Sequence, residues 1–309
     1  MNKNSKIYIA GHTGLVGSAV KRKLESLGYT NLVYRTRQEL DLMDDKKAAE
    51  FFEQERPEYV FMAAAKVGGI VANRDQPAEF IYQNLKIETS VIHNSYLQGV
   101  KKLCFLGSTC IYPKLAPQPI KEEYLLTGPL EETNDAYAIA KIAGIKMCQS
   151  YNKQYGTNFI SVMPTNLYGP NDNFDLTSSH VLPALIRRFH EAKINNVSEV
   201  IIWGTGKPKR EFLHVDDLAD TLMFLMEKYD DGEIINIGCG EDLAIIDLAK
   251  LIAKVVGFTG QIKNDTTKPD GTPRKLADVT RLFSLGWKPK ISLENGIKQT
   301  YQWFLDSAL

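Results

Sequence analysis

The sequence predicts an α/β protein with a doubly wound parallel sheet and a smaller α/β substrate-binding domain. Short apolar runs, at residues 6–10 and 58–65 among others, alternate with longer segments of helical composition, which is typical of βαβ units. A glycine-rich turn joins the first such run to its helix. A serine follows a later run at its carboxyl end, where open α/β sheets bind ligands.

The glycine-rich turn is the first feature that indicates a ligand. Gly11, Gly14 and Gly17 lie between a predicted strand at 6–10 and a predicted helix at 18–27. Glycines there let the backbone approach a pyrophosphate at a helix N-terminus, as in Rossmann-type dinucleotide sites. The spacing is G-x-x-G-x-x-G instead of the tighter G-x-G-x-x-G, so the prediction depends on the strand and helix on either side.

The end of the second predicted strand indicates which dinucleotide is bound. NAD sites commonly have an acidic residue about 20 positions after the glycines. Here the corresponding segment is Arg35-Thr36-Arg37, without an acid. Guanidinium groups suit a 2′-phosphate, so NADP(H) is favoured, chiefly through Arg37 with help from Arg35. The alternative is a pair of solvated arginines. Asp41 and Leu42 follow and are expected near the adenine.

Ser108, Tyr137 and Lys141 form a candidate catalytic group. Ser108 follows the predicted buried strand at 103–106. On a helix, Tyr137 and Lys141 would share one face, with Cβ atoms about 5–6 Å apart. An ammonium beside a phenol favours the phenolate and so lowers the phenol pKa, which would make Tyr137 an effective acid and base. An isolated Tyr-x-x-x-Lys is better interpreted as surface residues, but Ser108 and the glycine turn reverse that preference.

The later half of the chain contains candidate substrate ligands. We expect residues 1–166 to form the dinucleotide-binding domain, with a return segment near 213–240, and residues 167–309 to be mainly the substrate domain. Basic side chains there offer cations for a diphosphate, and Trp203 offers a stacking face. A basic rim with a core tryptophan is an equally good interpretation.

Composition narrows the class of protein. The 37 basic and 37 acidic residues balance, so a global basic field for nucleic acid or membrane binding is absent. Four scattered cysteines have neither metal-ligand spacing nor the density of a disulfide framework, and no apolar run of transmembrane length appears. We therefore expect a soluble cytoplasmic protein without a metal.

Together these motifs resemble the extended short-chain dehydrogenase/reductase superfamily, and most specifically its GDP-L-fucose synthase family. The resemblance covers nearly the whole chain, including the segments 63–70, 105–114, 137–145, 161–170, 210–217 and 268–276. It implies a homodimer that uses NADPH. The implied reaction converts GDP-4-keto-6-deoxy-D-mannose to GDP-L-fucose by epimerisation at carbons 3 and 5 and reduction at carbon 4. Two departures are Thr13, where many members have a basic residue, and Arg188, where some have lysine.

The resemblance also implies residue roles. Ser108, Tyr137 and Lys141 become the reductase group, and Cys110 and His180 the acid–base pair of epimerisation. From chemistry alone, Cys110 would be interpreted as a buried thiol and His180 as a loop histidine. A 4-keto group acidifies its neighbouring C–H bonds, and a thiol of pKa about 8.5 and an imidazole of pKa about 6.5 suit such proton transfers. The implied substrate ligands are Arg188, Trp203, Arg210 and Asp270.

The expected cofactor contacts come from the glycine turn, the segment after the second strand and the ends of the later strands. They are Gly11, His12, Thr13, Gly14, Leu15, Val16, Gly17, Arg37, Asp41, Leu42, Leu106, Gly107, Lys141, Pro164, Thr165, Asn166, Leu167 and His180.

Two other functions remain open from the sequence. One is a nucleotide-sugar 4-epimerase or dehydratase that retains NAD. Cys110 and a preference for NADP would distinguish this chain from such enzymes. The other is a binding module that senses NADP(H) without chemistry, against which the intact Tyr137 and Lys141 argue.

Overall fold

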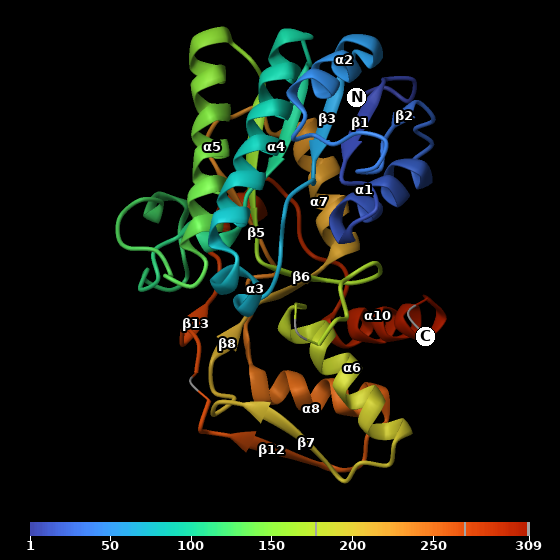
Figure 1. Cartoon of the computed structure of the whole chain (residues 1–309), viewed down its shortest axis with the longest axis vertical. Coiled ribbons are helices and arrows are strands. Elements are labelled where there is room, and N and C mark those ends of the chain that lie inside the picture. The colour runs from blue at the N-terminus through green and yellow to red at the C-terminus, as the bar shows by residue number, and fades with distance from the viewer. Residues whose placement is uncertain (177, 269, 308–309) are drawn as a thin grey trace.

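The computed structural model of the chain describes residues 1–176, 178–268 and 270–307. It confirms the predicted fold class. Six strands form one parallel sheet in the order β10-β5-β4-β3-β1-β2, at the top of Figure 1. Their bounds are β1 (Ile7–Ala10), β2 (Leu32–Val33), β3 (Tyr59–Met62), β4 (Lys102–Leu106), β5 (Phe159–Pro164) and β10 (Ile235–Ile237).

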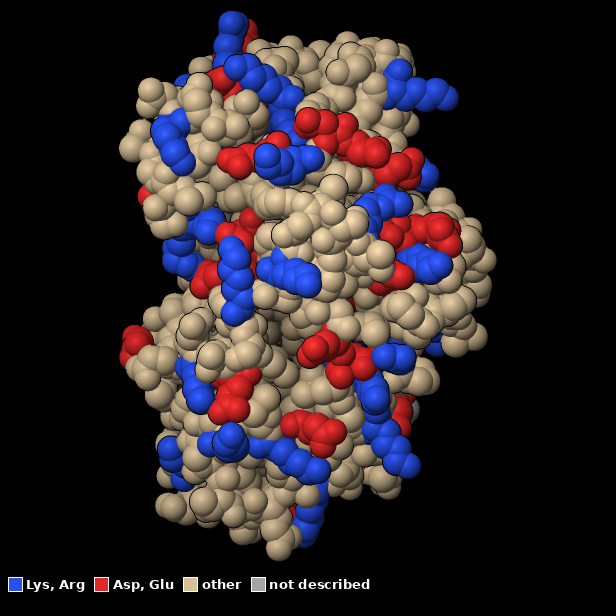
Figure 2. Space-filling view, turned by 180° about the vertical axis from the view of Figure 1, so that it is seen from behind, with Lys and Arg blue, Asp and Glu red and all other residues tan. Residues whose placement is uncertain are grey.

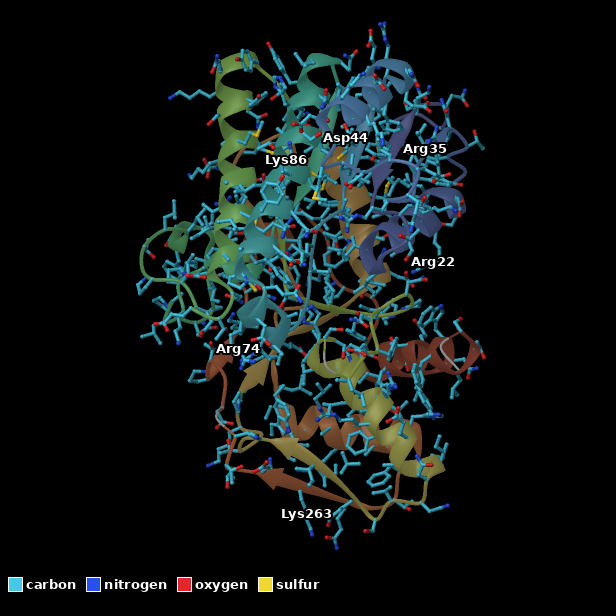
Figure 3. All side chains as sticks on the ribbon, in the orientation of Figure 1. Arg22, Arg35, Asp44, Arg74, Lys86 and Lys263 are labelled. Atoms are coloured by element: carbon cyan, nitrogen blue, oxygen red, sulfur yellow. The ribbon has the colours of Figure 1, made fainter. Side chains whose placement is uncertain are left out.

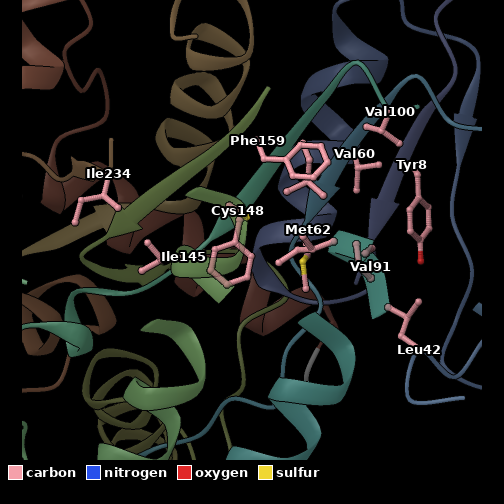
Figure 4. Close-up of a cluster of buried hydrophobic side chains, with 14 of the residues drawn as sticks. Tyr8, Leu42, Val60, Met62, Val91, Val100, Ile145, Cys148, Phe159 and Ile234 are labelled. Atoms are coloured by element: carbon pink, nitrogen blue, oxygen red, sulfur yellow. The ribbon is translucent and has the colours of Figure 1, made fainter. Parts of the chain in front are cut away.

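Helices cover both faces of this sheet. One face packs against α1 (Leu15–Ser26), α7 (Val215–Lys228) and the short α9 (Thr280–Ser284), and the other against α2 (Asp45–Glu55), α4 (Pro77–Leu97) and α5 (Asp135–Tyr155). Because side chains alternate along a strand, Tyr8, Val60 and Phe159 enter the α4–α5 core, part of which Figure 4 shows, whereas Ile9 and Ile160 enter the α1–α7 core. Burial on both faces explains why the strands read as continuous apolar runs.

The two longest helices of the described chain begin and end at recognisable signals. Pro77 occupies the first turn of α4, where its missing N–H costs no hydrogen bond, and Gly99 lies just beyond the helix with a positive φ of 67°. Gly156 ends α5 in the left-handed conformation, with φ 68° and ψ 27°. The two helices run side by side in Figure 1. Helix α7 begins at Val215, because the His214 side chain accepts a hydrogen bond from the Asp216 amide and caps it.

A smaller part of the chain lies at the carboxyl edge of the sheet, in the lower half of Figure 1. Its core lies among α6 (Val181–Ile194), α8 (Ile245–Val256) and α10 (Leu293–Ser307), against the pair β7 (Glu199–Trp203) and β12 (Gln261–Asp265). Short strands connect the halves, namely β6 (Asn166–Tyr168) with β9 (Phe212–His214), and β8 (Lys209–Arg210) between β11 (Leu243–Ala244) and β13 (Arg274–Lys275). The remaining elements are α3 (Ile70–Asp75) and the 3-10 helices Thr109–Ile111 and Glu122–Tyr124.

The surface carries charges of both signs. Figure 2 shows acidic and basic side chains interspersed over one face, in keeping with the balanced composition. In the ranges that the structure describes, every helix is too short or too polar to cross a membrane.

Candidate active site

The glycine turn lies where the strand order of the sheet reverses, between β1 and β3. Gly11 has φ 83°, and an added Cβ there would lie 2.8 Å from the Ala64 amide nitrogen, just past β3. At Gly17 the Cβ would lie 2.1 Å from the Gly11 carbonyl oxygen. Gly14, the N-cap of α1, offers no side chain to the first amides of that helix. The turn therefore leaves a helix N-terminus open to an anion, at the point where doubly wound sheets bind nucleotides.

The two arginines after β2 are not equivalent. The Arg35 guanidinium lies 2.7 Å from Glu55 Oε1 and 5.6 Å from the Phe51 ring centroid, and Figure 3 shows Arg35 at the outer edge of the sheet. Arg37 is exposed, and within the described ranges it has no ion-pair or hydrogen-bond partner. The expected help from Arg35 is therefore not what the structure favours, since its charge is already paired, whereas Arg37 is available.

Lys21 is a further cation near the end of β2 that the sequence analysis did not identify. The Lys21 ammonium lies 4.4 Å from the Tyr34 ring centroid, and the His12 imidazole stacks on the same ring at 4.6 Å. Burial and then Lys21 lower the pKa of His12. Lys21 lies nine positions after His12, and Tyr34 follows 13 positions later, so only the fold of β1, α1 and β2 reveals this group.

The structure brings Ser108, Tyr137 and Lys141 together. Ser108 lies just past β4, and its hydroxyl accepts a hydrogen bond from the Cys110 amide at 3.2 Å. It also hydrogen-bonds Tyr137. The buried Lys141 places its ammonium 5.8 Å from the Tyr137 ring centroid. The grouping proposed from spacing on one helix face and position at a strand end thus exists in the folded chain.

The expected lowering of the Tyr137 pKa is wrong. The pKa is raised, first by burial and then by Cys110 and Glu88, while the hydrogen bond to Ser108 opposes the shift. Lys141 does not supply the expected net positive charge, because its Nζ lies 2.9 Å from Glu88 Oε1. The sequence analysis did not identify Glu88, although helical periodicity would place this acidic residue on the buried side of α4.

Cys110 borders this group. It is partly buried in the 3-10 helix Thr109–Ile111. It raises the pKa of Tyr137, and it opposes the lowering of the Arg210 pKa that burial causes. Cys110 is therefore within electrostatic reach of both residues, one from each half of the molecule.

His180 follows a segment that is hydrogen-bonded to the loop after β3. It is the N-cap residue of α6 and makes no side-chain capping bond. Just before it, the Ser178 carbonyl accepts a hydrogen bond from the Gly69 amide at 2.9 Å. The Phe80 ring packs edge-on against the Tyr137 ring, with 6.4 Å between the ring centroids. A Cβ added at Gly68, in the loop after β3, would lie 3.2 Å from Cζ of Phe80. Although much of His180 is open to solvent, the surrounding protein lowers its pKa by desolvation.

Trp203 has an open face flanked by cations. It is 57% exposed, which excludes the interpretation of a core tryptophan. The Arg188 guanidinium and the Lys268 ammonium lie 5.7 and 5.8 Å from its ring centroid. An exposed indole with two neighbouring cations is suited to stacking a base and holding a phosphate.

Arg210 and Asp270 hold nearby loops. Arg210 donates to the carbonyls of Lys209 and Thr272, both at 2.7 Å. Asp270 accepts from the Thr205 amide at 2.8 Å and from the Thr205 hydroxyl at 2.6 Å. Asp270 thus ties the loop before β13 to the turn after β7.

Known proteins of one enzyme family are similar to this chain over nearly its whole length. Residues 7–238 match the NAD dependent epimerase/dehydratase family. The chain is 62% identical to the putative GDP-L-fucose synthase 2 of Arabidopsis thaliana, covering 100% of this chain and 94% of that protein. It is 57% identical to the GDP-L-fucose synthase of Escherichia coli K12, covering 98% and 97%.

Two solved structures are similar over nearly their full length. The Campylobacter jejuni GDP-mannoheptose C4 reductase with NADP bound has a TM-score of 0.92 and 47% identity, covering 99% of each chain. A Naegleria fowleri GDP-L-fucose synthetase bound to NADP has a TM-score of 0.93 and 32% identity, covering 100% of this chain and 96% of that one.

Proposed function

This chain belongs to the NAD dependent epimerase/dehydratase family, and we propose that it is a GDP-L-fucose synthase that uses NADPH. Its substrate is a GDP-sugar, specifically GDP-4-keto-6-deoxy-D-mannose. The observation that supports this most strongly is the meeting of Ser108, Tyr137 and Lys141 beside Cys110, at the carboxyl end of β4. The 57–62% identity to GDP-L-fucose synthases supports the choice of substrate.

The nucleotide half fits NADP(H). The glycine turn leaves a cradle that a Cβ at Gly11 or Gly17 would fill, and the free N-terminus of α1 suits a pyrophosphate. Arg37, together with Lys21 beside the Tyr34 ring, suits the 2′-phosphate and compensates for Thr13. We assign residues 1–166 and the return segment near 213–240 to the cofactor. The other cofactor contacts we propose come from the ends of β4 and β5 and the start of β6: Leu106, Gly107, Pro164, Thr165, Asn166 and Leu167.

Reduction at carbon 4 uses the phenol of Tyr137 as the acid. NADPH supplies the hydride. Burial and neighbouring negative charge raise the pKa of Tyr137, so the phenol keeps its proton near neutral pH and can give it to the carbonyl oxygen. The Ser108 hydroxyl hydrogen-bonds Tyr137 in the free protein, and it turns its one proton to the carbonyl oxygen when the substrate binds. The Lys141 ammonium lies behind the Tyr137 ring.

Epimerisation at carbons 3 and 5 uses Cys110 and His180. The keto group acidifies these two C–H bonds, and inversion requires a proton to return to the face opposite the one it left. Cys110 approaches from the β4 side and His180 from the α6 side, which gives two groups flanking the sugar. A lowered pKa keeps the His180 imidazole neutral and able to accept a proton.

The substrate half binds the GDP moiety. The exposed ring of Trp203 stacks the guanine, while Arg188 and Arg210 provide charge for the diphosphate. Asp270 contributes by fixing the loop against Thr205. Residues 167–309 outside the return segment thus form mainly the substrate domain.

The protein is a homodimer that forms through α4 and α5. Their outer surface exposes Tyr82 by 61%, Leu97 by 55%, and Ile139 and Tyr155 by 46% each. Large apolar side chains exposed along two adjacent helices favour burial against a second copy. Light scattering of the purified protein is expected to give twice the chain mass, and a monomer mass would rule the dimer out. The four unpaired cysteines support a reducing, cytoplasmic location.

Incubation with NADPH and GDP-4-keto-6-deoxy-D-mannose tests the function. We expect one NADPH oxidised per GDP-L-fucose formed, with the product identified by chromatography against a standard. A 4-epimerase or dehydratase with retained NAD would consume no NADPH, and an NADP(H) sensor would bind it without turnover. Either result would overturn the proposal.

A further inference from the structure

A buried carboxylate lies directly behind the candidate catalytic group. Glu88 projects from α4 into the seam with α5, and its side chain is 1% exposed. Its Oε1 lies 2.9 Å from Nζ of Lys141, whose side chain is 3% exposed. Glutamate and lysine are almost never buried this deeply unless they are paired. The two side chains therefore form an ion pair closed off from water.

Helix α5 leaves room for this carboxylate. Gly144 lies one turn after Lys141, and a Cβ there would be 2.9 Å from Glu88 Oε2 and 2.3 Å from Cζ of Phe105. Glycine is unfavourable in the middle of a helix compared with alanine. Phe105 in turn lies 4.9 Å, measured from its ring centroid, from the Lys141 ammonium. Lys141 is thus held in the seam between the Glu88 carboxylate and the rings of Phe105 and Tyr137.

Few titratable or charged groups face this arrangement. Tyr137 faces Cys110 after β4, Glu88 on α4 and Lys141 on its own helix, and it hydrogen-bonds Ser108. Glu88 faces Lys141 and also Cys148 of α5, a thiol whose pKa is raised mainly by burial and in part by Glu88. Burial raises the pKa of Glu88 itself, and Lys141 opposes that shift.

We propose that Glu88 is a positioning residue for the reduction, which holds the Lys141 ammonium in the α4–α5 seam and keeps Tyr137 a proton donor. The inference rests on the function proposed above. In the step concerned, carbon 4 gains a hydride, and the electron pair of the breaking C=O π bond takes the phenol proton. NADPH becomes NADP⁺, and Tyr137 becomes a phenolate that recovers a proton from water.

The charge at Glu88 has a consequence for pH dependence. Without the negative charge of Glu88, the positive charge of Lys141 is no longer balanced, so it favours the phenolate and lowers the pKa of Tyr137. The phenol is active in its protonated form, so activity falls as the pH rises through its pKa. A neutral residue at position 88 should therefore move the alkaline loss of activity to lower pH.

The test compares kcat/KM against pH for the wild type and Glu88→Gln, both with saturating NADPH. The variant keeps the shape of the side chain and loses its charge. We expect it to lose activity at lower pH, with about a tenfold deficit at the alkaline end of the wild-type plateau. Glu88→Asn provides the same loss of charge in a smaller side chain if the glutamine does not fold. Glu88→Asp keeps the charge and should keep the wild-type profile.

A second readout needs neither cofactor nor substrate. Tyrosinate difference spectra, with the titration of Tyr137→Phe subtracted in each background, isolate the ionisation of Tyr137. We expect that ionisation at lower pH in Glu88→Gln than in the wild type. The matched control is Asp230→Asn, which removes the carboxylate 2.7 Å from another buried lysine, Lys102, at the far end of β4, and should leave both profiles unchanged.

The outcomes separate the two proposals. A wild type that does not oxidise NADPH with the keto-sugar overturns the proposed function. An active wild type whose neutral variants keep the wild-type profiles overturns the role of Glu88. Equal movement of the profile in Glu88→Asp and Glu88→Gln also overturns it, because the effect would then arise from packing and not from charge.

Discussion

Replacing Gly17 by alanine should damage both the fold and the cofactor site. Alanine is about 1 kcal/mol better than glycine in a helix interior, and Gly17 lies inside α1, so propensity alone predicts stabilisation. The added Cβ, however, would lie 2.1 Å from the Gly11 carbonyl oxygen and 2.8 Å from the His12 Cα. These are backbone atoms that cannot rotate away, and overpacking typically costs about 1–3 kcal/mol. Because the 2.1 Å contact is with backbone, we place the clash at the upper end of this range, about 2–3 kcal/mol, which leaves a net destabilisation of about 1–2 kcal/mol.

The consequence can be measured in two ways. At about 2–4 °C per kcal/mol, the midpoint of thermal unfolding should fall by about 2–8 °C. The Kd for NADPH, from fluorescence titration, should rise about tenfold or more, because the loop must move away from its anion-binding geometry. Gly14→Ala is the matched control, since its Cβ would meet only the Gly11 oxygen at 3.6 Å and the cost is limited to about 1 kcal/mol of capping preference. A Gly17→Ala protein with wild-type stability and NADPH affinity would refute the reasoning.

Three further predictions concern the chemistry. Tyr137→Phe should lower the reduction rate by about 10²–10⁴-fold while NADPH binding stays near the wild-type value, and a variant with most of the wild-type turnover would remove Tyr137 from the role of acid. Arg37→Ala should reduce the preference for NADPH over NADH by about 10–100-fold, because about 1.5–3 kcal/mol of phosphate binding is lost, whereas Arg35→Ala should change the preference little. Measuring kcat/KM with each cofactor tests this, and equal use of both cofactors by the wild type would contradict the role of Arg37. Cys110→Ser and His180→Gln should bind NADPH yet form little GDP-L-fucose, and wild-type yields from both would make them bystanders.

The parts of the site that lie close in sequence could be predicted. Pro77 and Gly156 mark helix ends by backbone chemistry that acts within a few residues. Ser108 at a strand end and the Tyr137–Lys141 spacing also follow from local rules, because a strand delivers its carboxyl end to the ligand edge and a helix aligns residues four apart.

The parts that depend on pairing between distant elements could not be predicted. Helical periodicity places Glu88 on the inner side of α4, but only the packing of α4 on α5 brings it to Lys141. The rise of the Tyr137 pKa likewise depends on this packing, because burial is its main cause and Cys110 and Glu88 add to it. Likewise, Arg35 pairs with Glu55, 20 residues later in the chain. The exposure of Trp203 depends on which face of β7 is covered, which its sequence alone does not determine.

Isotope incorporation by the wild-type enzyme tests the central claim most directly. The purified protein is incubated with GDP-4-keto-6-deoxy-D-mannose and NADPH in deuterated water, and the product is analysed by NMR. We expect GDP-L-fucose with deuterium at carbons 3 and 5, the hydride from NADPH at carbon 4, and one NADPH consumed per product. A reduced sugar that carries no deuterium at carbons 3 and 5 would contradict it, because that product would show reduction without epimerisation.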